Sequence, residues 1–292
     1  MLEILGGLAE PHAIFSRVDQ RDGPRFLTFL LGYARRLRGE EQEMIRALAA
    51  PYLYHVVPRL KRGSAESRGN AVLILARMGL PQFADEVASS LSDDSPIVSM
   101  IAARSLFRPG HEDYFPEVLQ YLPRFAGWSR SFLSSMLAAG GTNATPLLRD
   151  ILANPHQEAL MRAIAADALR ELNDLSAVAL AVEIIADETD RELVVSCLRI
   201  LKQLGHHEHV PIVRAMTASP DELIRATAVA ALSATGGPQE ITLLEEKLED
   251  PTFWVSLEAA RGLVELGGSK TLERLASAQG PRSTLARQVL TE

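Results

Sequence analysis

One pattern of apolar and polar positions recurs along most of the chain and predicts a series of short helices. In its clearest copy, residues 221–237, apolar side chains stand four, seven and eight positions before Gly236. These positions share one face of an α-helix, which turns once every 3.6 residues. Glycine or asparagine at the end of each copy suits a helix C-cap, which often needs a left-handed backbone conformation. The pattern recurs about every 31 residues, with stops at Gly79, Gly110, Gly140, Asn173, Gly205, Gly236 and Gly267.

The apolar columns before these stops are consistent in all seven copies. The column four positions back contains Leu75, Leu106, Met136, Leu169, Leu201, Leu232 and Leu263. The column seven back contains Val72, Ala103, Leu133, Ala166, Leu198, Val229 and Ala260. The column eight back contains Ala71, Ala102, Phe132, Ala165, Cys197, Ala228 and Ala259. We predict that all three columns are buried, and that the small residues eight back allow a second helix to approach closely.

A second apolar-periodic segment follows each stop. Short turns rich in Asp, Ser and Pro then lead into the next copy, as expected of capping and turn residues. The repeating unit is therefore a helix, a turn and a second helix, which is too short to bury its own apolar face and must stack on its neighbours. The second segments span residues 81–91, 113–122, 144–152, 175–186, 209–217, 239–248 and 270–276.

Residues 248–267 (LEDPTFWVSLEAARGLVELG) resemble the HEAT repeat pattern. The arginine characteristic of that pattern is matched by Arg68, Arg162 and Arg225, and is missing from the other four copies. The resemblance covers roughly residues 64–292. It implies an all-α fold, a right-handed α-solenoid (α-α superhelix) of about seven HEAT-like helix pairs. Because HEAT arrays serve mostly as interaction scaffolds, it implies little about chemistry.

Residues 1–62 do not follow the repeat. Helices are expected at 25–37 and 40–50, with Pro51 ending the second and residues 53–60 pairing with the first repeat. We predict a helical N-terminal cap over residues 1–62 that covers the open face of the first repeat, as solenoids require. The repeat array then occupies residues 63–292, continuous with the cap, and ends in a shortened helix at 283–290.

Charge is divided unevenly between these two regions. Residues 1–62 carry a net charge of +3 and residues 63–292 a net of −10, against −7 for the whole chain. The basic clusters at 35–38 and 59–62 favour either a solvated helix end or an anionic lipid surface. A basic helical start followed by degenerate HEAT repeats also resembles the soluble part of bacterial membrane-anchored HEAT proteins. That resemblance implies a membrane tether upstream of Met1 or on a partner.

No stretch approaches the roughly 18 consecutive apolar residues of a membrane span, and the first 15 residues lack the basic start of a signal peptide. The single cysteine, Cys197, excludes an intramolecular disulfide and is predicted to be a small core residue. We therefore expect a bacterial cytoplasmic protein, with peripheral association or tethering at the inner membrane left open.

If the three apolar columns are buried, the positions two, six and nine back form an exposed ridge on the opposite face. In HEAT arrays this ridge lines the concave side, so it is the predicted contact surface for a protein or peptide partner. The alternative is a solvated ridge whose charges pair between repeats. The predicted partner-binding residues are Arg77, Arg104, Arg108, Ser131, Ser134, Asp167, Glu171, Arg199, Gln203, Glu258, Arg261 and Glu265.

The sequence offers no convincing catalytic, cofactor or metal site. The cluster His206–His209 and the pair His111–Glu112 are metal-like in composition, but both lie in predicted turns, where neighbouring side chains diverge. Trp128 and Trp254 stand beside the packing columns and are predicted to pack between repeats. The acidic repeat region disfavours a nucleic-acid partner. We predict a non-enzymatic scaffold; the alternative is a HEAT-type enzyme, either a lyase or an alkylpurine DNA glycosylase-like nucleic-acid binder.

Overall fold

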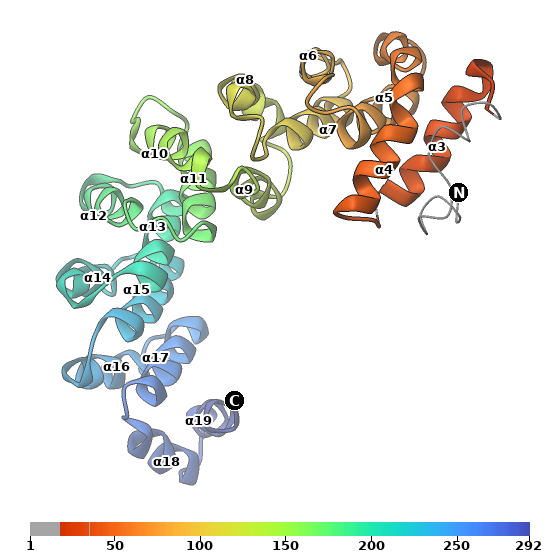
Figure 1. The fold of residues 1–292 in the computed structure, drawn as a ribbon. Helices are drawn as coiled ribbons and strands as arrows, with labels where there is room; N and C mark the ends of the chain where they lie inside the picture. Colours follow the sequence, from red (N-terminus) through yellow and green to blue (C-terminus); the bar gives the residue numbers. More distant parts are fainter. Residues whose placement is uncertain (1–17, 35) are drawn as a thin grey trace. The chain divides into compact units, whose positions relative to one another are not determined.

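A computed structural model describes residues 18–34 and 36–292. The chain divides into two compact units, Met1–Trp128 (unit 1) and Ser129–Glu292 (unit 2), and each is described by itself. Throughout the described residues the regular structure is helical, without strands (Figure 1). The predictions made for residues 1–15 and for Arg35 lie outside the described residues.

Unit 1 contains the predicted cap and the first two helix pairs. The cap consists of η1 (Gln20–Asp22), α3 (Gly23–Ala34), α4 (Glu40–Ala49), η2 (Ala50–His55) and η3 (Val57–Lys61). The first pair is α5 (Ala65–Met78) with α6 (Ala84–Ala88). The second is α7 (Pro96–Leu106) with η4 (Glu112–Tyr114), α8 (Phe115–Tyr121) and η5 (Leu122–Phe125). Cap elements α3, α4, η2 and η3 pack on α5, as expected of a segment that covers the first repeat. Residues 53–60 form 3-10 turns rather than an α-helix.

Unit 2 contains five further pairs and a final helix. The pairs are α9 (Arg130–Ala138) with η6 (Gly141–Ala144) and α10 (Thr145–Ala153), α11 (Ala159–Glu171) with α12 (Ala177–Asp187), and α13 (Arg191–Leu204) with η7 (His207–His209) and α14 (Val210–Met216). They continue with α15 (Glu222–Thr235), η8 (Pro238–Glu240) and α16 (Ile241–Lys247), then α17 (Phe253–Glu265) with α18 (Ser269–Ser277). The last helix is α19 (Pro281–Thr291).

Within each unit, the helices that end at the stop residues form one layer, and the helices that follow the stops form another. We call the first set ridge helices (α5 and α7 in unit 1; α9, α11, α13, α15 and α17 in unit 2) and the second set flanking helices. Within unit 2 the two layers are visible side by side (Figure 1). In unit 1, α7 packs on α5 and on the flanking helix α6. In unit 2, each ridge helix from α9 to α17 packs on the next, and those from α11 to α17 also pack on the flanking helix that precedes them. The stacked helix pairs confirm the α-solenoid architecture.

The predicted buried columns are confirmed almost completely. All residues four and seven positions before the stops are buried, and so are those eight before, with the exception of the half-buried Phe132. Cys197 is among the buried residues, in accord with the predicted core role. Burial of these apolar side chains is the main stabilising contribution to each helix pair.

The stop residues do not all adopt the left-handed conformation expected of them. Asn173, Gly110 and Gly267 have positive φ, at 54°, 89° and 84°. Gly205, in contrast, has φ −74°, and a Cβ there would lie only 2.4 Å from the carbonyl oxygen of Leu201. Glycine is needed at this stop because the backbone turns back against the helix end, not because φ is positive.

The three HEAT-type arginines fix the start of the next ridge helix. Arg68 Nε donates to Asp93 Oδ2 at 2.7 Å, while Asp93 Oδ1 accepts from the backbone N–H of Ser95, the N-cap of α7. In unit 2, Arg225 pairs with Asp250 in the same way, and Arg162 pairs with Glu188. In each case an arginine of one ridge helix holds the carboxylate that caps the loop into the next.

Within the described residues, none of the helices combines the length and the apolar character that a membrane crossing would need.

Candidate functional site

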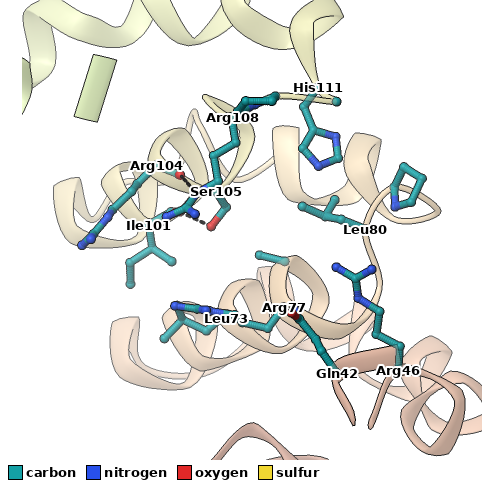
Figure 2. Close-up of a pocket in the computed structure, with 14 residues that line it drawn as sticks. Gln42, Arg46, Leu73, Arg77, Leu80, Ile101, Arg104, Ser105, Arg108 and His111 are labelled. Atoms are coloured by element: carbon teal, nitrogen blue, oxygen red, sulfur yellow. Dashed lines mark hydrogen bonds between the residues drawn. The ribbon is translucent and has the colours of Figure 1, made fainter. Parts of the chain in front are cut away.

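A basic pocket opens beside the ridge helices of unit 1 (Figure 2). Its volume is about 580 Å³, and α4, α5, α7 and the turns that follow α5 and α7 line it. Positive charge comes from Arg46 of α4, Arg77 of α5, and Arg104 and Arg108 at the end of α7. The other residues lining it are Gln42, Leu73, Ala76, Leu80, Pro81, Ile101, Ser105, Pro109, Gly110 and His111. None of the 14 lining residues is a carboxylate.

The arginines of this basic pocket raise the local positive potential. Arg77 and Arg108 form no ion pair with a carboxylate in the described part of the chain. Burial, together with the charges of Arg77 and Arg104, lowers the pKa of Arg108. Arg108 Nε donates to the backbone carbonyl of Arg104 at 3.2 Å, which holds its guanidinium against α7. Arg46 pairs with Glu43 at 2.7 Å, one turn back on α4.

His111 faces the basic pocket from the turn after α7. Figure 2 shows its ring and the Arg46 guanidinium on either side of the space beside Leu80. Burial and the charge of Arg46 lower the pKa of His111, while Glu112 opposes the shift. Glu112 itself accepts hydrogen bonds from the backbone N–H of Gly110 at 2.9 and 3.0 Å. The lowered pKa favours the neutral form of the imidazole.

A second pocket, of about 570 Å³, lies on the ridge helices of unit 2 and is of mixed charge. Arg130 at the start of α9 forms an ion pair with Asp167 of α11 at 3.0 Å and donates a hydrogen bond to Glu192 of α13 at 2.7 Å. Glu171 accepts hydrogen bonds from the hydroxyl group of Ser134 at 2.9 Å. The residues lining this pocket are Arg130, Ser131, Ser134, Asp167, Arg170, Glu171, Arg199, Lys202 and Gln203. Unlike the basic pocket, it includes two carboxylates among its lining residues, and one of them, Asp167, forms an ion pair with Arg130.

The predicted ridge residues do not form a single exposed stripe, and most of them line one of the two pockets. Arg77, Arg104 and Arg108 meet in the basic pocket, and six others, Ser131, Ser134, Asp167, Glu171, Arg199 and Gln203, line the pocket of unit 2. The expectation that the whole ridge is exposed is wrong. Ser134 is only 1% exposed and Asp167 5%, and Ser196 and Ala230 are also buried. Neighbouring ridge helices of unit 2 pack against the helices that carry these residues, which leaves a narrower exposed stripe than an isolated helix would have.

The last three predicted residues lie at the C-terminal end of unit 2. Arg261 donates to Glu258 at 3.0 Å and to Glu292 of α19 at 2.9 Å. These hydrogen bonds, that to Glu292 first, raise the pKa of Arg261. Glu258 also lies 4.0 Å from Lys202 of α13, and Glu265 is exposed. This cluster matches the alternative expectation of ridge charges paired between repeats.

Several residues of both pockets were missed at the level of sequence. Arg46 and Gln42 belong to the non-repeating cap, and His111 belongs to a turn. None of these three residues therefore stands in a repeat column. Arg130, Arg170 and Lys202 lie beside the chosen columns and reach the unit 2 pocket through their length. Arg46 had one usable signal: it stands in the last turn of a helix expected to cover the first repeat.

The aromatic and histidine candidates also have defined places. Trp254 is 62% exposed and contacts Phe253 edge to face at the start of α17, so its predicted packing between repeats is wrong. It occupies the second position of its helix, which points away from the neighbouring ridge helix. In the turn at η7, the backbone N–H of His206 donates to His209 Nδ1 at 2.9 Å. Among described residues, no three His, Cys, Asp or Glu side chains are grouped as a metal site would require.

Comparison with known proteins supports the class that these elements define, an all-α repeat protein built from stacked helix pairs. Residues 191–263 match the model of HEAT repeats. A search of curated proteins finds no match. The chain is thus an all-α protein with an α-solenoid fold, and its segment from α13 to α17 matches HEAT repeats.

Solved structures resemble the chain in fold. The crystal structure of Kap121p bound to RanGTP matches with a TM-score of 0.55 and 14% identity, over 98% of this chain and 38% of that chain. Kap121p bound to Ste12p matches with a TM-score of 0.53 and 16% identity, over 98% and 38%. The chain therefore spans less than half the length of these Kap121p chains. The complex of CpcE and CpcF of phycocyanin lyase from Nostoc sp. reaches only 0.35, at 18% identity over 82% and 86% of the two chains, which is too low to carry an argument.

Proposed function

We propose that the chain is a non-enzymatic scaffold that binds a partner protein or peptide through its ridge helices. The observation that carries this proposal is the basic pocket of unit 1, where four arginines line one cavity without a carboxylate among its walls. Concave, partly apolar cavities with a few charged groups are where proteins commonly bind ligands. Arginine is also enriched at the energetic centres of protein interfaces. Acidic groups on the partner fit this charge.

The similar solved structures support the proposal at the level of the fold. The karyopherin Kap121p, as its structures are described, binds RanGTP, Ste12p and the extreme C-terminus of Cdc14p. A stack of helix pairs presents a long surface built from many repeats, on which a protein segment can lie. Because identity is only 14–16%, those partners are not carried over to this chain.

The proposal places the protein in the bacterial cytoplasm, with peripheral association or tethering at the inner membrane. The basic side chains near η3, such as Arg59, Lys61 and Arg62, are the supporting feature, since polybasic segments are attracted to anionic lipid. Co-sedimentation with vesicles of phosphatidylglycerol and phosphatidylcholine tests the membrane part. Binding that is lost in Arg59→Glu/Lys61→Glu supports it, whereas no binding to vesicles at low salt removes it.

Charge reversal in the basic pocket tests the scaffold function. The double variant Arg104→Glu/Arg108→Glu inverts the charge of exposed side chains at the end of α7 and should leave the thermal unfolding temperature nearly unchanged. A matched control, Lys270→Glu/Arg274→Glu, reverses the same number of charges on flanking helix α18. Pull-down with each variant as bait, quantified by mass spectrometry, should show a protein retained by the wild type and the control and lost from the pocket variant. Equal retention by all three baits would remove the pocket from the binding surface.

A further inference from the structure

We propose that the basic pocket of unit 1 binds a phosphate group carried on a side chain of the partner, so that the partner is recognised in its phosphorylated form. This inference deepens the proposed scaffold function and rests on it. It goes further by naming the chemistry of the group that occupies the pocket, a phosphomonoester dianion.

The first argument is that two arginines of the basic pocket, Arg77 and Arg108, form no ion pair with a carboxylate in the described part of the chain. Burial, and then the nearby charges of Arg77 and Arg104, lower the pKa of Arg108 and so disfavour its charged form. Like charges in a partly desolvated cavity repel more strongly than in water, so an anion placed between them lowers the energy of the whole cluster. Other arginines of the ridge helices already have a carboxylate partner, as Arg68 has Asp93 and Arg130 has Asp167.

The second argument is the number and origin of the donors. The four guanidinium groups belong to residues of α4, α5, α7 and the turn after α7, so the cavity has donors from several elements. A phosphate ester presents three acceptor oxygens and a charge of about −1.5 to −2 at pH 7, and matches several guanidinium forks at once. A single carboxylate has two oxygens and one charge, and therefore satisfies fewer of these donors. Clusters of arginine are a recurring mode of phosphopeptide recognition.

The third argument is the apolar part of the lining. Leu73, Leu80 and Ile101 line the same cavity as the arginines, and its volume of about 580 Å³ exceeds what a free phosphate ion fills. The remaining space suits the body of a side chain that carries the phosphate, as well as the neighbouring residues of the partner. Duplex nucleic acid fits less well, because its phosphates need a basic stripe and not one pocket on a chain of net charge −7.

Binding of defined probes tests the proposal. Fluorescein-labelled peptide pools with random flanks and one central residue, phosphoserine, phosphotyrosine, serine or glutamate, are titrated with the full chain and followed by fluorescence anisotropy. We expect at least one phosphorylated pool to bind ten times more tightly than the glutamate pool, and the serine pool not to bind. Equal affinity for the glutamate and phosphorylated pools would overturn the phosphate assignment, and so would tighter binding of a DNA duplex or of anionic vesicles.

Variants place the binding in the basic pocket. Arg77→Gln/Arg108→Gln should weaken the phosphorylated pool at least tenfold without lowering the unfolding temperature, because it relieves repulsion between the two cations. The control Lys270→Gln/Arg274→Gln on α18 should bind like the wild type. As a reporter of position, the ring resonances of His111 should shift when phenyl phosphate is added to the wild type, and not in the Arg77/Arg108 variant. Equal weakening in both variants would overturn the site.

The two proposals fail in distinguishable ways. If partner capture depends on Arg104 and Arg108 but phosphatase treatment of the lysate leaves capture unchanged, the scaffold function stands and the phosphate inference falls. If all baits capture the same proteins in equal amounts, the pocket is not a partner-binding surface, and the proposed scaffold function of this pocket is contradicted. Loss of capture after phosphatase treatment, restored by phosphatase inhibitors, supports both.

Discussion

Arg225 of α15 holds the carboxylate of Asp250 through two hydrogen bonds, Nε to Oδ2 at 3.0 Å and Nη2 to Oδ1 at 3.1 Å. Asp250 Oδ1 also accepts from the backbone N–H of Thr252 at 2.9 Å, which is the N-cap of α17. The guanidinium in addition donates to the backbone carbonyls of Ser219 and Pro220 at 3.0 Å. One side chain thus fastens the loop before its own helix to the loop before the next.

Loss of Arg225 should destabilise unit 2 through Asp250. In Arg225→Met the Asp250 carboxylate, whose side chain is only 8% exposed, keeps its backbone hydrogen bond and loses its charged partner. Removing one partner of a buried ion pair costs about 3 kcal/mol, because the other charge remains desolvated. Urea unfolding should show a decrease of this order in the free energy of unfolding of Arg225→Met. The double variant Arg225→Met/Asp250→Asn should recover part of that free energy. If the double variant is as unstable as the sum of the single variants, the two residues do not act as a pair.

The equivalent pair in unit 1 should make stability depend on pH. The hydrogen bond from Arg68 lowers the pKa of Asp93, whereas burial raises it. The Ser95 N–H and the charges of Arg68 and Arg124 lower this pKa further. A carboxyl with a depressed pKa in the folded state stabilises the protein above its unfolded pKa, about 3.9, and loses this contribution as pH falls through the folded value. The difference in unfolding temperature between the wild type and Asp93→Asn should therefore be constant near neutrality and shrink below about pH 4.

The matched control for this measurement is Asp94→Asn, at the exposed neighbouring residue, which forms no ion pair in the described part of the chain. It should change the unfolding temperature little at pH 7. A difference for Asp93→Asn that stays constant from pH 7 to pH 3 would contradict the assigned role of Arg68.

A charge in the buried stripe of α15 should disrupt the stack. Ala228 is fully buried between ridge helices, so the carboxylate of Ala228→Asp would be desolvated without a partner. We expect a loss of at least about 3 kcal/mol in the free energy of unfolding, in the range of the most damaging single substitutions. Ala234→Asp places the same group on the exposed side of the same helix, near its C-terminus, and should cost much less. Circular dichroism melts of the two variants compare them directly, and equal melting temperatures would break the assigned register.

The thiol of Cys197 should be unreactive in the folded protein. Burial raises its pKa to about 12, with the charge of Arg162 acting in the opposite direction. Only the thiolate is nucleophilic, so its population at pH 8 is very small and the side chain is also inaccessible. Iodoacetamide at pH 8 should leave the native mass unchanged and add one carbamidomethyl group after unfolding in urea. Rapid labelling of the native protein would show that α13 opens locally.

The buried columns could be predicted from the sequence because they depend only on helix geometry and the need to bury apolar groups. Leu232 and Ala228, four and eight positions before a stop, must share a face whenever the segment is helical. The arginine of the HEAT pattern was equally visible at Arg68 and Arg225. Its carboxylate partner, 25 residues later in both cases, was not, because that pairing requires the loop to fold back.

The candidate site could be predicted only in part. Arg104 and Arg108 follow from the helical register, since they stand opposite the buried stripe of α7. Arg46 and His111 reach the same cavity from a non-repeating helix and from a turn, which no column describes. The helical register predicts that Ser134 and Asp167 are exposed, whereas packing between ridge helices buries both.

The sequence by itself determined the all-α repeat, its period and the buried face of each ridge helix, because these depend on the local spacing of apolar residues. Tertiary structure decided which side chains of the opposite face remain open to a ligand. That outcome depends on how closely adjacent helices pack, and on long arginine side chains that either find a carboxylate across a repeat or, as at Arg77 and Arg108, line a cavity without one in the described part of the chain. The basic pocket is therefore a property of the packed helices, and the repeat alone does not predict it.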